Sequence, residues 1–249
     1  MNDDVYVKLD RPAFLCWADI ETTGLDPVKD DVLELYLVLT TFSSPFLPVD
    51  SKASRHFIIT GRGHDRMLSG DVHAFVYSMH ERSGLRAELD DLDKLSDLAT
   101  VEKDLLDLSK DWPGVGVDVT KLPDEERRRV TDSKVVIAGN SSHFDLSFLR
   151  AHLPRFAARL SHRVFDVSAM SLLARSMGMP RLPKAERHRA KVDVEESMFQ
   201  AQLISDWLDA CPQSFRRRVP MTDDEYAAAR KIWYSGRQRR AEYMKTASK

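Results

Sequence analysis

The sequence has few of the features that define several large classes of protein. It contains only two cysteines in 249 residues, Cys16 and Cys211, and their spacing fits neither a disulfide framework nor a zinc cluster. No apolar run approaches the roughly 20 residues that cross a bilayer, and the first residues, MNDDVYVKLD, carry acids where a signal peptide has bases. We therefore expect a cytoplasmic protein outside the membrane. Both cysteines are interpreted as reduced core thiols, with a catalytic thiol as the alternative.

The chain also lacks a marked excess of charge of either sign. Its 37 Lys and Arg residues and 39 Asp and Glu residues leave a net charge of −2, which does not by itself indicate a polyanion-binding protein. Residues 212–249 contain ten basic and four acidic residues, a balance of +6, so residues 1–211 carry −8. Carboxylates that hold metals, together with a basic end that contacts phosphate, would give this distribution. A solvated helix with an arginine-rich face explains the basic end more simply.

The composition is otherwise that of an ordinary globular protein, with 43% apolar and 31% charged residues. We predict one main domain over 1–211, interrupted by an inserted loop at 113–133 that is rich in glycine, proline and charge. A basic helical extension over 212–249 follows, and its last helix opens with Thr222 and Glu225 in a capping box.

The apolar patterns predict a mixed α/β sheet flanked by helices. Apolar runs indicate strands at 13–20, 32–42 and 56–60. These form an antiparallel meander, because the first connection is too short for a crossover helix. Two more strands are expected at 135–138 and near 164–165. Helices are expected at 71–80, from Thr100 to about Trp112, and at 142–152, 168–177 and 191–210, with Thr100, Ser142 and Ser168 as N-caps and at most one turn at 124–130.

Two carboxylates are predicted to leave one face of the first strand. Asp19 and Glu21 stand at the end of the apolar run with one residue between them, and side chains two apart on a strand share a face. Two buried anions so close to each other repel and lose hydration, which is unfavourable without a cation or a cluster of donors. A metal site is one interpretation. The alternative is that the strand ends at Ala18 and both acids are exposed in the turn.

Three more candidate residues lie at later element ends. Asp145 follows Ser142 by three residues, which fits a capping box with Ser142. Metal ligation is compatible with this, because a carboxylate has two oxygens. His188 and Asp193 are five residues apart, about 500° on a helix, and would not share a helical face. A metal site therefore requires His188 on the preceding loop and Asp193 in the first turns. Otherwise Asp193 is an acid favoured near a helix N-terminus and His188 is a surface residue.

The order of these residues resembles that of the DEDD family of 3′-to-5′ exonucleases. The segments that carry the resemblance are WADIETTGLDP, GNSSHFDLSFL and HRAKVDVEES. The histidine of the H-x4-D pattern is typical of the subgroup that uses a histidine as the base. The resemblance implies a ribonuclease-H-like fold with a five-stranded mixed sheet, three antiparallel strands followed by two parallel ones, and helices on both sides.

Within this family the chain is most similar to the oligoribonucleases. Besides the first and third motifs, FDVSAMSLLAR and MHERSGL match segments of that group. Thr22 stands where a methionine is usual, and Phe144-Asp145-Leu146-Ser147-Phe148 replaces the usual Gln-Asp-Arg-Arg-Phe. Residues 113–133 and the chain beyond Pro212 also lie outside the family pattern.

The resemblance implies a mechanism with two divalent cations, Mg²⁺ or Mn²⁺. Asp19, Glu21 and Asp193 would hold one cation, and Asp19 with Asp145 would help to hold a second, about 4 Å away. His188 would accept the proton of the attacking water. The products would be 5′-mononucleotides released from the 3′ end.

The resemblance also assigns contacts to the substrate. Leu25 would wedge between bases and Phe75 would stack on one, although a turn residue closing the core and a core aromatic are the alternatives. His80 would be a site histidine, or else a helix-end histidine favoured by the helix dipole.

The terminal phosphate would be capped by three further residues, with the last two supplied by a second subunit. They are Ser141, Arg163 and Ser168. Arginine is suited to a phosphate clamp, but Ser168 could be only a helix cap and Arg163 only a surface charge.

The predicted function is removal of short single-stranded RNA oligomers by a homodimer. A general or DNA-directed single-strand 3′ exonuclease of the proofreading type is the alternative within enzymes, suggested by the generic second motif and the basic end. A non-catalytic nucleic-acid-binding module would be expected to lack a metal ligand, and none is missing from the motifs.

Overall fold

The computed structural model describes residues 14–182 and 187–210. Its centre is one mixed sheet, built from the apolar runs of the sequence. The strands are β1 (Phe14–Thr22), β2 (Val32–Thr41), β3 (Ser54–Ile59), β4 (Leu95–Ser96), β5 (Val136–Gly139) and β6 (Val164–Asp166), in the order β4-β3-β2-β1-β5-β6.

The strand directions confirm the predicted fold class. β1, β2 and β3 form the antiparallel meander, and β5 and β6 follow β1 in parallel. The sheet has six strands where five were predicted. The extra strand, β4, pairs in parallel with β3 over only two residues, which is too short to produce an apolar alternation in the sequence.

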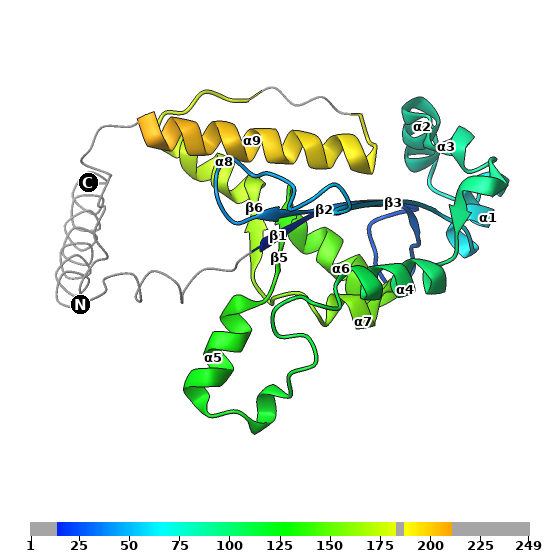
Figure 1. Cartoon of the computed structure of the whole chain (residues 1–249). Coiled ribbons are helices and arrows are strands. Elements are labelled where there is room, and N and C mark those ends of the chain that lie inside the picture. Colours follow the sequence, from blue (N-terminus) through cyan, green and yellow to red (C-terminus); the bar gives the residue numbers. More distant parts are fainter. Residues whose placement is uncertain (1–13, 183–186, 211–249) are drawn as a thin grey trace, which may run out of the picture. The chain divides into compact units, whose positions relative to one another are not determined.

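Helices cover both faces of this sheet. Figure 1 shows α8 and α9 on one face and α4, α6 and α7 on the other. The helices are α1 (Arg62–Ser69), α2 (Ala74–Ser83), α3 (Leu85–Glu88), α4 (Leu98–Leu108), α5 (Asp124–Ser133), α6 (Ser142–His152), α7 (Pro154–Ala157), α8 (Val167–Ser176) and α9 (Ala190–Ala210), with short 3₁₀ turns at Leu92–Lys94 and Val119–Lys121. No helix within the described ranges is long and apolar enough to cross a membrane.

The core surrounds β1 and β2, which are buried on both faces. Leu15, Trp17 and Leu37 have no exposed surface, and the indole Nε1–H of Trp17 donates to Thr40 Oγ1 at 2.9 Å. A strand in this position needs an apolar run rather than an alternating pattern. The consequence is that polar residues at the end of β1 emerge inside the molecule rather than at its edge.

Aspartates cap two helices that were predicted to begin with a hydroxyl side chain. The Asp97 carboxylate accepts from the Thr100 N–H at 2.7 Å and caps α4, so Thr100 is not the N-cap. The Asp166 carboxylate accepts from the Ser168 N–H at 2.8 Å and caps α8, so Ser168 lies inside the helix. In each case an aspartate two or three residues upstream satisfies the free amides of the first turn.

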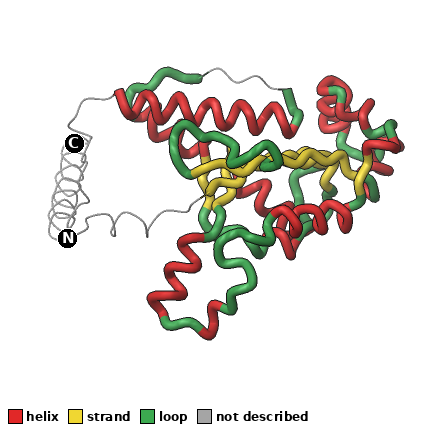
Figure 2. The backbone as a smooth tube through the Cα atoms, in the orientation of Figure 1, coloured by secondary structure: helices red, strands yellow, loops and turns green. Residues whose placement is uncertain are grey.

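The insertion at 113–133 contains more helix than was predicted. α5 has 10 residues where at most one turn was expected, and its three consecutive acids, Asp124 to Glu126, favour the positive end of a helix. Figure 2 shows α5 and its flanking loops projecting away from the sheet. The predicted extension 212–249 and Cys211 lie outside the described residues.

Candidate active site

The end of β1 carries two of the predicted carboxylates. β1 continues to Thr22, so Asp19 and Glu21 belong to the strand, and the alternative of a strand that ends at Ala18 is wrong. The Glu21 side chain is buried, with 7% of the residue exposed. The pairing register places Glu21 opposite Glu34 of β2, immediately before the pairing becomes irregular at Thr22.

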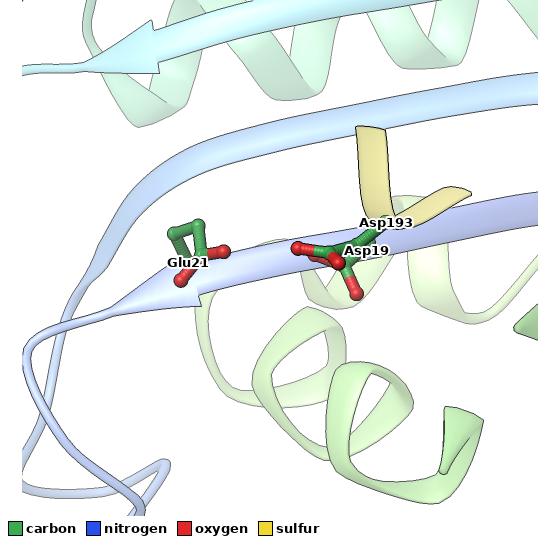
Figure 3. Close-up of side chains that lie close together, drawn as sticks. All are labelled: Asp19, Glu21 and Asp193. Atoms are coloured by element: carbon green, nitrogen blue, oxygen red, sulfur yellow. The ribbon is translucent and has the colours of Figure 1, made fainter. Parts of the chain in front are cut away.

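α9 adds the third carboxylate from the other end of the chain. The helix begins at Ala190, so His188 lies on the preceding loop and Asp193 in the first turn, the arrangement that a metal site requires. Oxygen atoms of Asp19, Glu21 and Asp193 lie within 4.8 Å of one another. Figure 3 shows these carboxylates, two from β1 and one from the helix. The backbone of His188 has a φ of 50°, which is rare for a residue with a side chain.

Asp145 reaches the same region from the first turn of α6. It is almost fully buried, and its Oδ1 accepts from the backbone N–H of Ile20 at 3.0 Å. The carboxylate is thereby fixed beside the residue that separates Asp19 from Glu21. The capping box proposed for Ser142 and Asp145 is wrong, because Ser141 is the N-cap of α6 and no side chain caps it.

A single cleft joins all five residues predicted from the motifs. Its volume is about 270 Å³. The cleft is lined by Asp19, Ile20, Glu21, Asn140, Ser141, Phe144, Asp145, Ser168, His188, Asp193 and Ser197.

The carboxylates of the cleft oppose each other's ionisation. Burial raises the pKa of Glu21 to about 9, with further contributions from Asp19 and Asp193. Burial, followed by the charge of Asp19, raises the pKa of Asp145 well above its usual range. Without a cation the cluster therefore tends to hold protons. Closely spaced carboxylate oxygens are the ligands that hard divalent cations prefer, so these residues fit such an ion.

A buried ion-pair network fixes the start of α9, and the sequence motifs did not reveal it. Glu34 is fully buried. Its carboxylate accepts from Arg189 Nε at 3.1 Å and from the Ala190 N–H at 3.2 Å. The other end of the Arg189 guanidinium donates to Glu88 at 2.8 Å. Because Arg189 follows His188 directly, the network anchors the loop that presents the imidazole.

The same network also includes Asp193 in α9 and His56 in β3. The Arg189 backbone N–H donates to Asp193 Oδ2 at 3.0 Å, and His56 Nε2 lies 2.7 Å from Glu34 Oε1. These bonds and the Arg189 charge keep the pKa of Glu34 low, although burial, the largest single influence, opposes this. The only signal in the sequence was one acid inside the apolar strand VLELYLVLTT, since a glutamate is rarely fully buried unless it is paired.

His80 lies behind the carboxylates rather than on the surface. It is fully buried at the end of α2, and its Nε2–H donates to the Thr22 carbonyl at 2.8 Å. Its Nδ1 is 3.9 Å from Glu21 Oε2. Burial is the main cause of the lowered pKa of His80. The imidazole therefore holds the end of β1 and faces Glu21.

Leu25 and Phe75 are exposed, so neither side chain belongs to the core. Their exposed fractions are 82% and 62%, large for apolar side chains, and the alternatives in which they close or fill the core are wrong. Both lie on segments that flank Glu21: Leu25 in the turn after β1 and Phe75 on α2.

Of the three predicted phosphate-capping residues, two lie together in this chain and the third lies apart from them. Ser141 and Ser168 line the cleft, and their Oγ atoms are 3.4 Å apart. Ser168 therefore reaches the cleft of its own chain, which differs from the expectation that a second subunit supplies it. Arg163 precedes β6, is exposed, and does not line the cleft.

Cys16 has no part in this site. It is buried in β1, and burial raises the pKa of its thiol to about 12. A thiol with so high a pKa is almost entirely protonated near neutral pH and is a poor nucleophile. The interpretation of Cys16 as a core thiol therefore holds, and the alternative of a catalytic thiol does not.

Comparison with curated proteins identifies relatives over most of the chain. The mitochondrial oligoribonuclease of Saccharomyces cerevisiae is 30% identical over 210 residues, which cover 82% of this chain and 70% of that protein. The oligoribonuclease of Mycobacterium ulcerans is 32% identical over 199 residues, 76% of this chain and 78% of that protein. No protein-family model matches the chain.

Solved structures support the same fold. The zinc-bound complex of Escherichia coli exonuclease I with single-stranded DNA has a TM-score of 0.51 at 15% identity, and the match covers 80% of this chain. Exonuclease I from Methylocaldum szegediense also has a TM-score of 0.51 at 15% identity. The chain spans 43% and 40% of these two longer proteins. With the sequence matches over most of its length and this shared fold, the chain belongs to the oligoribonuclease family.

Proposed function

We propose that this protein is a metal-dependent 3′-to-5′ exoribonuclease that degrades short oligoribonucleotides to 5′-mononucleotides. The observation that carries the proposal is the convergence of Asp19, Glu21, Asp145, His188 and Asp193, from three distant parts of the sequence, in one cleft. The relatives named oligoribonuclease support the same activity.

The carboxylates would hold the cations in this proposal. Asp19, Glu21 and Asp193 would bind one Mg²⁺ or Mn²⁺, and Asp19 with Asp145 would contribute to a second. Bound cations of this kind lower the pKa of water and neutralise the charge that develops on a phosphodiester. Two observations indicate that these residues fit a cation. Oxygen atoms of Asp19, Glu21 and Asp193 lie within 4.8 Å of one another, and burial together with the neighbouring acids raises the pKa of Glu21, which a bound cation would offset.

The chain's own residues then orient the attacking water and accept its proton. His188 accepts a proton from the attacking water, whose oxygen forms a bond to the terminal phosphorus as the bond from phosphorus to the 3′ oxygen of the preceding nucleotide breaks. The leaving oxygen takes up a proton, and the nucleotide departs as a 5′-monophosphate. An imidazole on a loop is suited to this task, because histidine exchanges protons near neutral pH.

Exposed residues around the cleft would bind the nucleic acid. Leu25 would insert between bases and Phe75 would stack on one, and the exposure of both side chains leaves their apolar surfaces available for such contacts. Such stacking is worth about 1–3 kcal/mol per base. Ser141 and Ser168 would contact the terminal phosphate, and Arg163 would reach it from the second subunit of a homodimer. His80 would be a site histidine beside Glu21. In this proposal the protein acts in the cytoplasm.

Product analysis with RNA and DNA of different length tests the proposal. Labelled strands of two, five and twenty nucleotides are incubated with the enzyme and Mn²⁺, and the products are separated on a gel or a thin layer. The expected result is that the two- and five-nucleotide RNA strands are consumed faster than the twenty-nucleotide strands and the DNA, and that they yield only mononucleotides. Absence of cleavage of every strand would overturn the nuclease proposal.

A general or DNA-directed single-strand exonuclease is the second candidate. It is favoured by Phe144-Asp145-Leu146-Ser147-Phe148, a second motif that departs from the oligoribonuclease pattern and places Phe144 in the cleft wall. Faster degradation of the twenty-nucleotide strands, or of DNA, would select this function over the first.

A further inference from the structure

A second cavity shares a wall residue with the carboxylate cleft. It has a volume of about 600 Å³, larger than the cleft itself, and lies between α2 and the loop before α9. His188 is part of the wall of both cavities. The cavity is lined by Met79, Arg82, Ser83, Arg187, His188, Arg189 and Val192.

The three arginines of this cavity differ in the charge that they leave available. Arg189 is held by Glu34 at 3.1 Å and by Glu88 at 2.8 Å, so two carboxylates compensate its charge. Arg82 and Arg187 are exposed, and neither guanidinium pairs with a carboxylate from residues 14–182 or 187–210. The positive charge that a ligand would meet therefore comes from Arg82 and Arg187.

The positive charge of Arg82 and Arg187 matters for binding a polyanion because of the composition of the neighbouring cleft. Its four carboxyl groups, Asp19, Glu21, Asp145 and Asp193, supply no positive charge, so the cleft by itself does not attract a polyanion. A cation bound there would attract only the phosphodiester that contacts it. Arginine forms paired hydrogen bonds to phosphate and keeps its charge at any physiological pH. Two arginines beside the cleft that have no carboxylate partner among the described residues therefore suit a second phosphate.

We propose that Arg82 and Arg187 form a subsite for a backbone phosphate of the nucleic acid other than the one that is cleaved. The inference rests on the proposed function for its substrate class, single-stranded oligonucleotides. It extends that function by adding a contact that a dinucleoside monophosphate, with only its scissile phosphate, does not make. The subsite raises the affinity for longer oligomers and leaves the chemical step unchanged.

Binding measured without turnover tests the subsite separately from the nuclease activity. Fluorescence anisotropy of a labelled five-nucleotide RNA is recorded in EDTA over a range of salt concentrations, for the wild type, Arg82→Gln and Arg187→Gln. Each variant is expected to bind about tenfold more weakly at 0.1 M salt, the loss of one charge-assisted contact. The slope of log K against log [salt] should become shallower by about 0.7 for each lost contact.

Arg155→Gln is the matched control, since it removes the same charge from an exposed position on α7, which packs against α4 and α6. Its affinity and salt slope should equal those of the wild type. Equal binding by all four proteins, or no binding by the wild type, would overturn the subsite.

Kinetics supply a second readout on the same variants. The kcat/KM of Arg82→Gln should fall about tenfold on the five-nucleotide RNA and stay within twofold on a dinucleoside monophosphate, with kcat unchanged on both. An equal fall on both substrates would contradict the subsite. A wild type that binds RNA but cleaves nothing would refute the proposed function while leaving the binding result to stand.

Discussion

At the scale of single residues, the cleft combines groups that are unstable together unless something compensates them. Four carboxylates line it, and the pKa values of Glu21 and Asp145 are raised. Removing an ion from water costs several kcal/mol. Neutral side chains would therefore be more stable than these carboxylates at the same positions unless the carboxylates bind a cation. Single substitutions can separate the role of the His188 imidazole from the role of the carboxylates.

Substitution of His188 and of Asp19 should have different effects on metal binding. His188→Ala removes the proton acceptor but none of the carboxylates, so it should bind Mn²⁺ as the wild type does and lose about 10²- to 10⁴-fold in kcat. Asp19→Ala should lose both binding and turnover. Calorimetric titration with Mn²⁺ beside a gel assay measures both quantities, and full activity in either variant would refute the role assigned to that residue.

The raised pKa of Glu21 predicts how the stability of the metal-free protein depends on pH. The folded state keeps the Glu21 proton up to about pH 9, whereas the unfolded chain releases it near pH 4.5. Between these values the folded state binds more protons, so stability falls as pH rises.

Thermal unfolding in EDTA from pH 5 to pH 9 measures this slope. Glu21→Gln, which cannot ionise, should show a shallower decline than the wild type and a higher midpoint at pH 9. Saturating Mn²⁺ should reduce the difference between the proteins, because it stabilises only the chain that keeps the carboxylate. Parallel curves for the two proteins in EDTA would contradict the assignment.

At the scale of elements, the start of α9 decides where His188 and Asp193 lie. Glu34 accepts from the first amide of the helix and from the Arg189 side chain, and Arg189 donates its own amide to Asp193. These bonds surround the left-handed backbone of His188. A conformation of this kind persists when its neighbours determine it from several sides.

Loss of the Glu34–Arg189 pair should weaken the site without unfolding the protein. Arg189→Lys keeps the charge but loses the two separate guanidinium hydrogen bonds to the two oxygens of Glu34, so metal affinity or kcat should fall about 10- to 100-fold, as is usual for residues that orient ligands. Glu88→Gln is the control, because Glu88 is the more exposed partner; it should stay close to the wild type.

Circular dichroism melting separates this effect from a general loss of stability. A variant Arg189→Lys that folds, binds Mn²⁺ and turns over like the wild type would show that the network does not position the site.

The sequence indicated which residues line the cleft better than it indicated which side chains bond to one another around it. Asp19, Glu21, Asp145, His188 and Asp193 were identified because each stands where a strand or helix begins or ends. Glu34 was missed because it lies within an apolar strand, and its partner Arg189 is 155 positions away. The caps of α4 and α8 were misassigned because serine and threonine compete with aspartate for the same role. Local patterns contain no information about which of several capable side chains meets the free amides.

At the scale of the whole molecule, the described residues bring the four predicted carboxylates together but not the three residues predicted to contact the terminal phosphate. Ser141 and Ser168 reach the cleft from their own chain, whereas exposed Arg163 does not line it. If the predicted homodimer supplies Arg163 across its interface, each site needs two chains. This arrangement can be tested without knowledge of the interface.

Mixing two inactive variants should restore activity if Arg163 acts on the partner's cleft. Asp19→Ala lacks a metal ligand, and Arg163→Gln lacks the arginine. In a mixed dimer, the cleft of the Arg163→Gln chain keeps Asp19 and receives Arg163 from the Asp19→Ala chain, so one of the two sites is complete. Equimolar unfolding and refolding of the pair should therefore recover about one quarter of wild-type activity on the dinucleotide, since half of the dimers are mixed and each of these has one complete site. An arginine that served its own chain's cleft would leave the mixture no more active than the sum of its parts.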